Sequence, residues 1–240
     1  MTLPTDYAGL TLWLDATQDS FSDGDPVGTW TDRSGNSRNF TGVTTARPTF
    51  KTNIFGSKPA LMFDGNDVLS IAALSNTIVP KSASSTFAVF KAITFPTDAT
   101  PVYNNGAILG DADGFFSLNI AGTTNGIGAY THDPQFEVVQ SAGIALDTMY
   151  VAHMRHDSVN LVVSLDGVET STPCAARDGN NVAVEIGGSY STFFINAYIA
   201  ELFCYSAARS APEVAALITY LDEKWSGAAA TRPLPVRNRF

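Results

Sequence analysis

The chain has 240 residues, of which 45% are hydrophobic and 15% are charged, so it can close one sizeable core and a single domain is expected. Its formal net charge of −9 disfavours binding to nucleic acid, because a protein that contacts the phosphate backbone needs a basic face. The N-terminus lacks a basic start followed by an apolar run, and no apolar stretch is long enough to span a membrane, so we expect neither a secretory signal nor membrane insertion.

Alternation of apolar and polar residues with a period of two recurs along the chain and predicts β-strands. It is clearest in residues 10–14, 86–90, 115–120 and 161–165. Clusters of Gly, Asn and Asp separate these segments, and such residues close hairpins because they tolerate positive φ. Since the long helical crossovers of a parallel sheet are missing, neighbouring strands should pair antiparallel. The sequence therefore predicts an all-β fold, an antiparallel β-sandwich of the jelly-roll type.

The two cysteines, Cys174 and Cys204, are too few for a disulfide framework in a chain of this size. We expect both to be buried thiols, in a protein made in a reducing cytoplasm.

One helix is predicted near the C-terminus. Ser210 and Glu213 have the spacing of a capping box, and Pro212 suits the first turn. Apolar residues follow at helical spacing as far as Trp225, and Gly227 can end the helix. We expect this apolar stripe to pack against the sandwich.

Residues 227–240 form a predicted extended basic arm, because two prolines favour extended backbone. The arm carries three arginines and no acid, so subtracting +3 from −9 leaves the body, residues 1–226, at −12. Such an arm could dock on its own domain, on a neighbouring copy or on another protein, and the alternative is a disordered tail. The residues predicted to dock are Arg232, Pro233, Arg237, Arg239 and Phe240.

Several segments resemble a laminin G-like domain of the concanavalin A-like lectin and glucanase superfamily, of the type found in phage and bacterial surface proteins. Residues 12–16, 27–36 and 59–69 are similar to the first half of such a domain, and residues 165–169, 186–188, 198–205 and 220–225 to the second half. Ala197 departs from the pattern, which has Gly there. The resemblance covers about residues 8–226 and implies a jelly roll of two curved sheets. It leaves the function open, because this fold serves lectins, hydrolases, adhesins and virion parts.

A glucanase version of the fold would need two carboxylates at alternate positions of one strand, facing the same groove. No strand has that spacing, and Glu185 and Glu201 are interpreted as paired or rim residues in apolar strands. His153 and His156 are three residues apart and should lie on opposite faces of a strand, so they predict no shared metal. We therefore expect no enzymatic activity.

Calcium is the one cofactor that the superfamily suggests, since its members often hold it with Asp side chains and backbone oxygens. The candidate loops contain Asp19, Asp23 and Asp25, or Asp111 and Asp113. Neither loop matches the calcium-loop consensus, and solvated turn residues are the alternative interpretation.

For sugar binding, the fold would offer aromatic and amide side chains on rim loops. The candidates are Tyr103, Asn105, Tyr130, His132, Asp133 and Tyr190. Aromatic residues in loops also plug the ends of sandwiches, which is the structural alternative.

The leading hypothesis is a non-catalytic virion protein, such as a phage capsid-decoration, head-fibre or tail-associated protein. It would occur as a homo-oligomer or in many copies on the virion surface after cytoplasmic synthesis. It would attach through its arm to a scaffold protein, and it could also adhere to host glycans. The alternatives are a freestanding carbohydrate-binding protein at an extracellular surface and a polysaccharide-degrading enzyme whose loops assemble distant acids.

Overall fold

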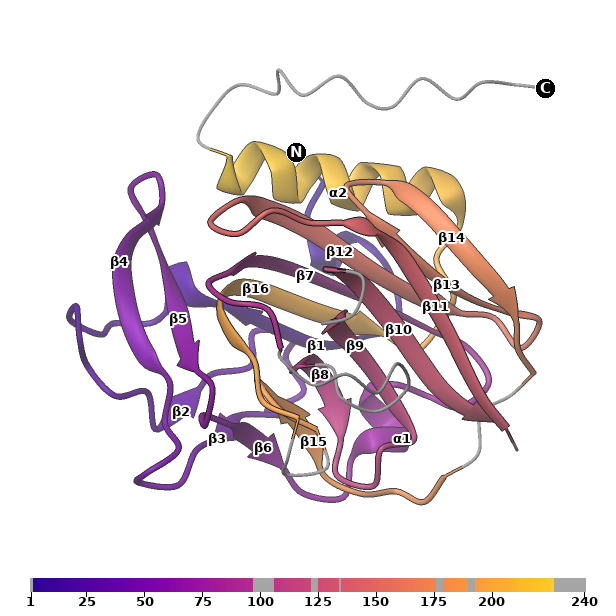
Figure 1. Ribbon diagram of the computed structural model, residues 1–240, viewed down its shortest axis with the longest axis horizontal. Coiled ribbons are helices and arrows are strands. Elements are labelled where there is room, and N and C mark those ends of the chain that lie inside the picture. The colour runs from indigo at the N-terminus through magenta and orange to yellow at the C-terminus, as the bar shows by residue number, and fades with distance from the viewer. Residues whose placement is uncertain are drawn as a thin grey trace.

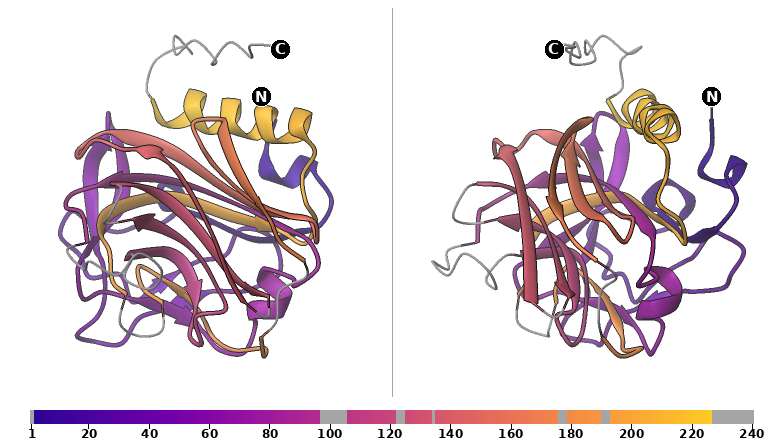
Figure 2. Two further views of the ribbon diagram at one scale, coloured as in Figure 1. Left: turned by 45° about the vertical axis from the view of Figure 1, so that its right-hand side comes forward. Right: turned by 90° about the vertical axis from the view of Figure 1, so that its right-hand side faces the viewer.

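The computed structural model describes residues 2–96, 106–121, 125–133, 135–175, 179–189 and 193–226, with the backbone alone for 132, 133, 135–140 and 142. Its strands form two antiparallel sheets that pack face to face, as predicted (Figure 1). One helix of substantial length, α2 (Ala211–Trp225), lies across the outer side of the first sheet (Figure 2). No helix in the described ranges is both long and apolar enough to cross a membrane.

The first sheet has its strands in the order β14-β13-β12-β7-β16-β5-β4, and β1 also pairs with β16. The N-terminal and C-terminal strands thus lie side by side, with Trp13 opposite Phe203 and Asp15 opposite Glu201. The bounds are β1 (Leu10–Asp15), β4 (Thr49–Phe55), β5 (Lys58–Asp64), β7 (Ser84–Ala92), β12 (Met149–His156), β13 (Asn160–Leu165), β14 (Val168–Pro173) and β16 (Asn196–Tyr205).

The second sheet has the order β11-β10-β9-β8-β15-β6-β3-β2. Its bounds are β2 (Thr29–Trp30), β3 (Phe40–Thr41), β6 (Leu69–Ile71), β8 (Gly106–Asp111), β9 (Phe116–Ala121), β10 (Gly126–Asp133), β11 (Gln135–Gly143) and β15 (Val184–Ile186). The short helical segments are η1 (Pro4–Asp6), η2 (Ala16–Gln18) and α1 (Ser75–Ile78).

Two apolar clusters hold these layers together. The larger fills the space between the sheets and includes Leu12, Phe90, Leu118 and Ile199. The second cluster lies between the outer face of the first sheet and α2, where Leu217 and Trp225 are among the buried helix residues. Burial of apolar area on this scale is the main force that fixes the layers.

The helix begins as predicted. The Glu213 carboxylate accepts hydrogen bonds from the Ser210 backbone N–H at 2.8 Å and from the Ser210 hydroxyl at 2.7 Å, within a capping box. The apolar stripe faces the sheet, since Val214, Leu217, Leu221 and Trp225 are all buried.

Local hydrogen bonds also explain the loop that follows β2. Asp32 Oδ1 accepts the Trp13 and Ser34 backbone N–H groups at 3.0 and 2.9 Å, and Oδ2 accepts that of Arg38 at 2.9 Å. A single carboxylate thus closes the loop and joins it to β1, as expected for a loop-forming aspartate. The nearby Trp30 is fully buried, and its Nε1 has no hydrogen-bond partner within the described ranges.

Two positions of the laminin G-like pattern have clear structural roles. Gly187 has φ +83°, and a Cβ there would lie 2.1 Å from the Phe63 ring, so the position requires glycine. Ala197, the departure from the pattern, pairs in regular register with Phe63 and Ala92 and is fully buried. The substitution therefore leaves the entry of β16 intact.

Candidate functional site

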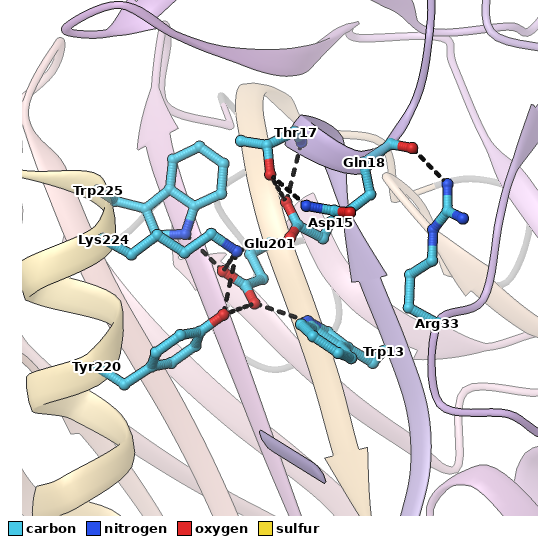
Figure 3. Close-up of polar contacts among 9 residues, drawn as sticks. All are labelled: Trp13, Asp15, Thr17, Gln18, Arg33, Glu201, Tyr220, Lys224 and Trp225. Atoms are coloured by element: carbon cyan, nitrogen blue, oxygen red, sulfur yellow. Dashed lines mark hydrogen bonds and ion pairs between the residues drawn. The ribbon is translucent and has the colours of Figure 1, made fainter. Parts of the chain in front are cut away.

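A buried carboxylate organises the contact between α2 and the first sheet (Figure 3). Glu201 Oε1, on β16, accepts hydrogen bonds from Trp13 Nε1 at 2.7 Å and from the Tyr220 hydroxyl at 2.8 Å. Its Oε2 accepts one from Trp225 Nε1 at 2.6 Å and lies 2.8 Å from Lys224 Nζ. We call these five residues the Glu201 cluster; it joins β1, β16 and α2.

Lys224 links this cluster to a second acid. Its Nζ lies 2.6 Å from Asp15 Oδ2, and its side chain is 15% exposed whereas the Glu201 side chain is fully buried. Burial raises the pKa of Glu201, and the neighbouring Lys224 ammonium opposes that shift. Because both carboxylate oxygens are already in use and shielded from solvent, the cluster fixes the helix rather than offering a site to a ligand. Of the two roles predicted for Glu201, a paired acid or a rim residue, the structure shows the paired acid.

The rest of the first sheet's outer face beneath α2 is aromatic and closed. Phe87 stacks on Phe203 with ring centroids 4.9 Å apart and on His153 at 4.3 Å. His153 is fully buried, and burial lowers its pKa to about 3, so the imidazole is neutral at ordinary pH. His156 instead lies within hydrogen-bond distance of the Ala175 carbonyl oxygen, so the two histidines lie apart, as predicted.

The outer face of the second sheet, which we call the second-sheet face, is polar by contrast. On β9, Phe116, Leu118 and Ile120 belong to the core between the sheets. Ser117 and Asn119 alternate with them and therefore point away from that core.

Strand register places further side chains beside Ser117. Gly110 on β8 and Tyr130 on β10 both pair with Ser117, and Glu185 on β15 pairs with Gly110. Directly opposite residues of an antiparallel pair project from the same side of the sheet. Glu185, Gly110, Ser117 and Tyr130 thus form one row across the second-sheet face.

Asn119 heads a second row, in which Ala107 and Gly128 are its partners. Its Nδ2 donates to Ser117 Oγ at 2.8 Å. A Cβ at Gly128 would lie 2.5 Å from Asn119 Oδ1, so the amide occupies the space that glycine leaves open. This oxygen is buried, in a residue 4% exposed, and it has no hydrogen-bond partner within the described residues. A buried acceptor without a partner costs free energy unless something else satisfies it.

The segment after β15 folds onto the same face. The Ser189 hydroxyl donates to the Asp111 carbonyl oxygen at 2.9 Å, and it would lie 2.7 Å from a Cβ at Gly110. Asp111 Oδ1 in turn accepts the Phe115 backbone N–H at 2.7 Å. Glycine at position 110 therefore permits a close approach that any side chain would block.

Tyr130 is the one predicted sugar-binding side chain that lies within the described residues. It is 6% exposed and belongs to strand β10 rather than to a rim loop, which corrects the expected location. His132 and Asp133 are on the same strand, opposite Phe136 and Gln135, and their side chains lie outside the description. Tyr103, Asn105, Tyr190 and the arm residues Arg232, Pro233, Arg237, Arg239 and Phe240 are outside the described residues.

In the first acidic loop considered for calcium, the three carboxylates make contacts within the protein. Asp19 Oδ1 lies 3.0 Å from Arg33 Nη2, Asp23 accepts the Thr52 backbone N–H at 2.8 Å, and Asp25 accepts that of Ser22 at 2.7 Å. Within the described ranges, no group of three or more His, Cys, Asp or Glu residues is placed to hold a metal ion.

Sequence reasoning missed Ser117, Asn119 and Glu185 as members of one surface. The available signal was the polar half of the alternation in residues 115–120, but the pairing with β8 and β10 comes from the register alone.

No family model matches the chain, and no curated protein matches it. Solved structures do. Domain 4 of a GH43 extracellular arabinanase from Geobacillus stearothermophilus, in complex with arabinotriose, is 15% identical with a TM-score of 0.66, covering 88% of this chain and 98% of that one. Trypanosoma rangeli sialidase in complex with sialic acid is 12% identical with a TM-score of 0.64, covering 91% of this chain and 34% of that one.

A third similar structure is the binding domain of botulinum neurotoxin serotype D. It is 13% identical with a TM-score of 0.59, and the match covers 88% of this chain and 51% of that one. At these identities the likeness concerns the fold, and the chain shares the two-sheet β-sandwich of these proteins.

Proposed function

We propose that this chain is a non-catalytic carbohydrate-binding module, whose ligand contacts the second-sheet face around Asn119, Ser117 and Tyr130. The observation that carries the proposal is the Asn119 amide oxygen, which is buried and lacks a hydrogen-bond partner in the described part of the chain. Asn119 lies on β9 and points away from the core between the sheets, whereas α2 packs on the outer face of the first sheet.

The chemistry of this face suits a saccharide. Sugar hydroxyls both donate and accept hydrogen bonds, and amide and hydroxyl side chains can do the same. Gly110 and Gly128 let the Ser189 hydroxyl and the Asn119 amide lie close to the sheet. Tyr130 adds an amphipathic ring next to Ser117. A few convergent polar groups with an aromatic neighbour are typical of small-ligand sites.

The similar structures support the same proposal. One is an arabinanase domain in complex with arabinotriose, one is a sialidase in complex with sialic acid, and one is the binding domain of botulinum neurotoxin serotype D. The resemblance to laminin G-like domains of the concanavalin A-like superfamily is consistent with a binding module of this type. Absence of catalysis is proposed because Glu201 is enclosed by α2 and so is withheld from any substrate.

As a second proposal, the protein attaches to a virion or another surface scaffold; the opposite net charges of the arm and the body support it. The arm of residues 227–240 carries +3 and the body −12, so the arm is suited to an acidic partner surface. In this proposal the protein acts in many copies, and its second-sheet face contacts glycans of the host.

A glycan array probed with the labelled full-length chain tests the carbohydrate proposal. We expect binding to at least one glycan class, and a loss of about 10- to 100-fold in affinity for Asn119→Ala and for Tyr130→Ala, the effect of losing a buried ligand hydrogen bond. Asn160→Ala, on β13 of the first sheet, is the matched control and should bind normally. A blank array with protein whose thermal unfolding is intact would refute the proposal.

A further inference from the structure

The side chain of Lys224 lies where an amine can react with a carboxyl group. Its Nζ is 2.6 Å from Asp15 Oδ2 and 2.8 Å from Glu201 Oε2 (Figure 3). The side chains of Asp15 and Glu201 are 1% and 0% exposed, and the two residues are directly opposite each other in the β1–β16 pair. An amine and two carboxyl groups are thus held in contact in a place that contains little solvent.

The other oxygen of Asp15 accepts hydrogen bonds from the protein. The Thr17 backbone N–H and hydroxyl donate to Asp15 Oδ1 at 2.9 and 2.7 Å. Two fixed donors on one carboxyl oxygen stabilise the negative charge that this oxygen gains when a nucleophile attacks the carbon. Oδ2, which contacts Lys224, is then the oxygen that can leave. The Asp15 carboxyl group is therefore set up as an electrophile toward the Lys224 amine.

Glu201 is suited to move protons between these groups. Burial raises the pKa of Glu201, and the neighbouring Lys224 ammonium opposes that shift. Because burial disfavours its charged form, the Glu201 carboxylate can take a proton from the ammonium and leave a neutral, nucleophilic amine. The indoles of Trp13 and Trp225 hold this carboxylate in place by donating to its two oxygens.

Aromatic side chains keep water away from the same atoms. Lys224 Nζ lies 5.1 Å from the centroid of the Trp225 ring and 5.4 Å from that of the Tyr220 ring, and both rings belong to buried residues. Condensation of an amine with a carboxyl group releases water. A site that holds the two reactants in contact and excludes water therefore favours the amide over its hydrolysis.

We propose that Lys224 and Asp15 form an intramolecular amide bond in the folded protein, with Glu201 as the proton carrier. The new bond joins Nζ to Cγ, and the Cγ–Oδ2 bond breaks. Of the three ammonium protons, one stays on the amide nitrogen and two leave with Oδ2 as water, and Glu201 transfers both. Glu201 ends in its initial state, so the reaction needs no further reactant. The ion pair between Lys224 and Asp15 is the state before the reaction.

The bond joins the first strand of the sandwich to its closing helix. Asp15 and Lys224 are 209 positions apart, so nearly the whole body lies within the closed loop. A cross-link between distant residues restricts the unfolded chain and thereby stabilises the fold. Residues 227–240 follow α2 in the sequence, so tension on that segment would pass through the bond to β1.

Mass spectrometry of the full-length chain, denatured after purification, tests the bond. We expect a mass lower than that of the sequence by one water molecule, and a proteolytic fragment in which Asp15 and Lys224 are joined. Lys224→Arg keeps the positive charge but lacks the amine, so it should have the full mass of its sequence and migrate differently on a denaturing gel. Lys91→Arg is the matched control and should keep the loss of water, because the Lys91 ammonium lies over the Tyr198 ring.

The parent chain decides whether the bond exists, whatever the stability of the variants. A full sequence mass in a chain that circular dichroism shows to be folded would overturn the inference. A loss of water that persists in Lys224→Arg would overturn it as well, because the loss would then have another origin.

Two variants of Glu201 test the proton carrier, with the cross-linked fraction followed over time after cell-free synthesis. Glu201→Gln is close to the parent in size but accepts no proton, so the bond should form about 100-fold more slowly or not at all. Glu201→Asp is shorter but keeps a carboxylate, and it should be faster than Glu201→Gln. A purely structural role would give the opposite order, and cross-linking of Glu201→Gln at the parent rate would overturn the role of Glu201.

Discussion

Replacing Glu201 by leucine tests whether one buried carboxylate holds the closing helix on the sandwich. Glu201→Leu introduces an apolar side chain of comparable size and removes the acceptor for the Trp13 indole, the Tyr220 hydroxyl and the Trp225 indole. It also removes one of the two carboxylates that face Lys224. Three buried donors and part of a charge pair would then be left without their partner.

The expected cost follows from these contacts. Breaking a buried ion pair by removal of one member typically costs about 3–5 kcal/mol. Lys224 moderates the loss, because it keeps Asp15 at 2.6 Å and is 15% exposed. The indole and hydroxyl donors increase the loss of stability, since a buried unsatisfied donor costs roughly 1–3 kcal/mol. We therefore expect Glu201→Leu to lower the free energy of unfolding by roughly 3–5 kcal/mol.

Glu201→Gln should cost less, because the amide keeps one oxygen acceptor and its NH₂ group can donate to the Tyr220 hydroxyl. Roughly 1–3 kcal/mol is expected, the range for one unsatisfied donor. Glu223→Leu, an exposed position near the same end of α2, is the matched control and should stay within about 0.5 kcal/mol of the parent protein.

Urea unfolding followed by tryptophan fluorescence and far-UV circular dichroism measures these differences. The fluorescence is informative because two of the three tryptophans, Trp13 and Trp225, donate directly to Glu201. A Glu201→Leu protein as stable as the Glu223→Leu control would show that the Glu201 cluster does not anchor the helix.

Two further predictions concern acid stability and the arm. Burial lowers the pKa of His153 to about 3 whereas an unfolded histidine titrates near 6.5, so protonation favours the unfolded chain between these values. Stability should fall on acidification from pH 6.5 towards pH 3, by up to about 1.4 kcal/mol per pH unit. His153→Phe should show a shallower loss in urea titrations between about pH 4.5 and 6.5, and identical pH slopes would contradict this account. Deletion of residues 228–240 should leave the urea midpoint unchanged but abolish incorporation into particles, and normal incorporation would rule out docking through the arm.

Local features were predictable from the sequence because they depend on neighbouring residues. The capping box of Ser210 and Glu213 and the apolar stripe of α2 need only helical spacing. The Asp32 loop likewise follows from a side chain that bonds backbone groups close to it. Period-two alternation was enough to predict the strands and the sandwich class.

The Glu201 cluster was not predictable in the same way, because its members come from three elements that are distant in sequence. An acid in an apolar strand indicated that Glu201 would be paired, but nothing local identified Trp13, Tyr220 or Lys224 as its partners. That knowledge requires the pairing of the first strand with the last, which places Asp15 opposite Glu201. Non-local pairing of this kind has no periodic signal.

Because non-local pairing cannot be predicted from the sequence, the predicted sugar contacts were mainly aromatic residues and did not include Asn119. Ser117 and Asn119 look like the ordinary solvent side of a strand until the register places Gly110 and Gly128 beside them. Glycine on a neighbouring strand changes the place of an amide, because it leaves space that the Asn119 amide fills.

The two outer faces of the sandwich differ in the side chains that they carry and in the elements that pack on them. The outer face of the first sheet carries Phe87, Phe203 and Glu201. Leaving these side chains half-buried would cost free energy unless an element covers them that is apolar and also donates hydrogen bonds. The helix α2 has both properties. The second-sheet face carries Ser117, Asn119 and glycine at its centre instead, and the segment that contains Ser189 folds onto it. Its amide and hydroxyl groups can exchange hydrogen bonds with a saccharide, which is why the carbohydrate proposal is assigned to this face.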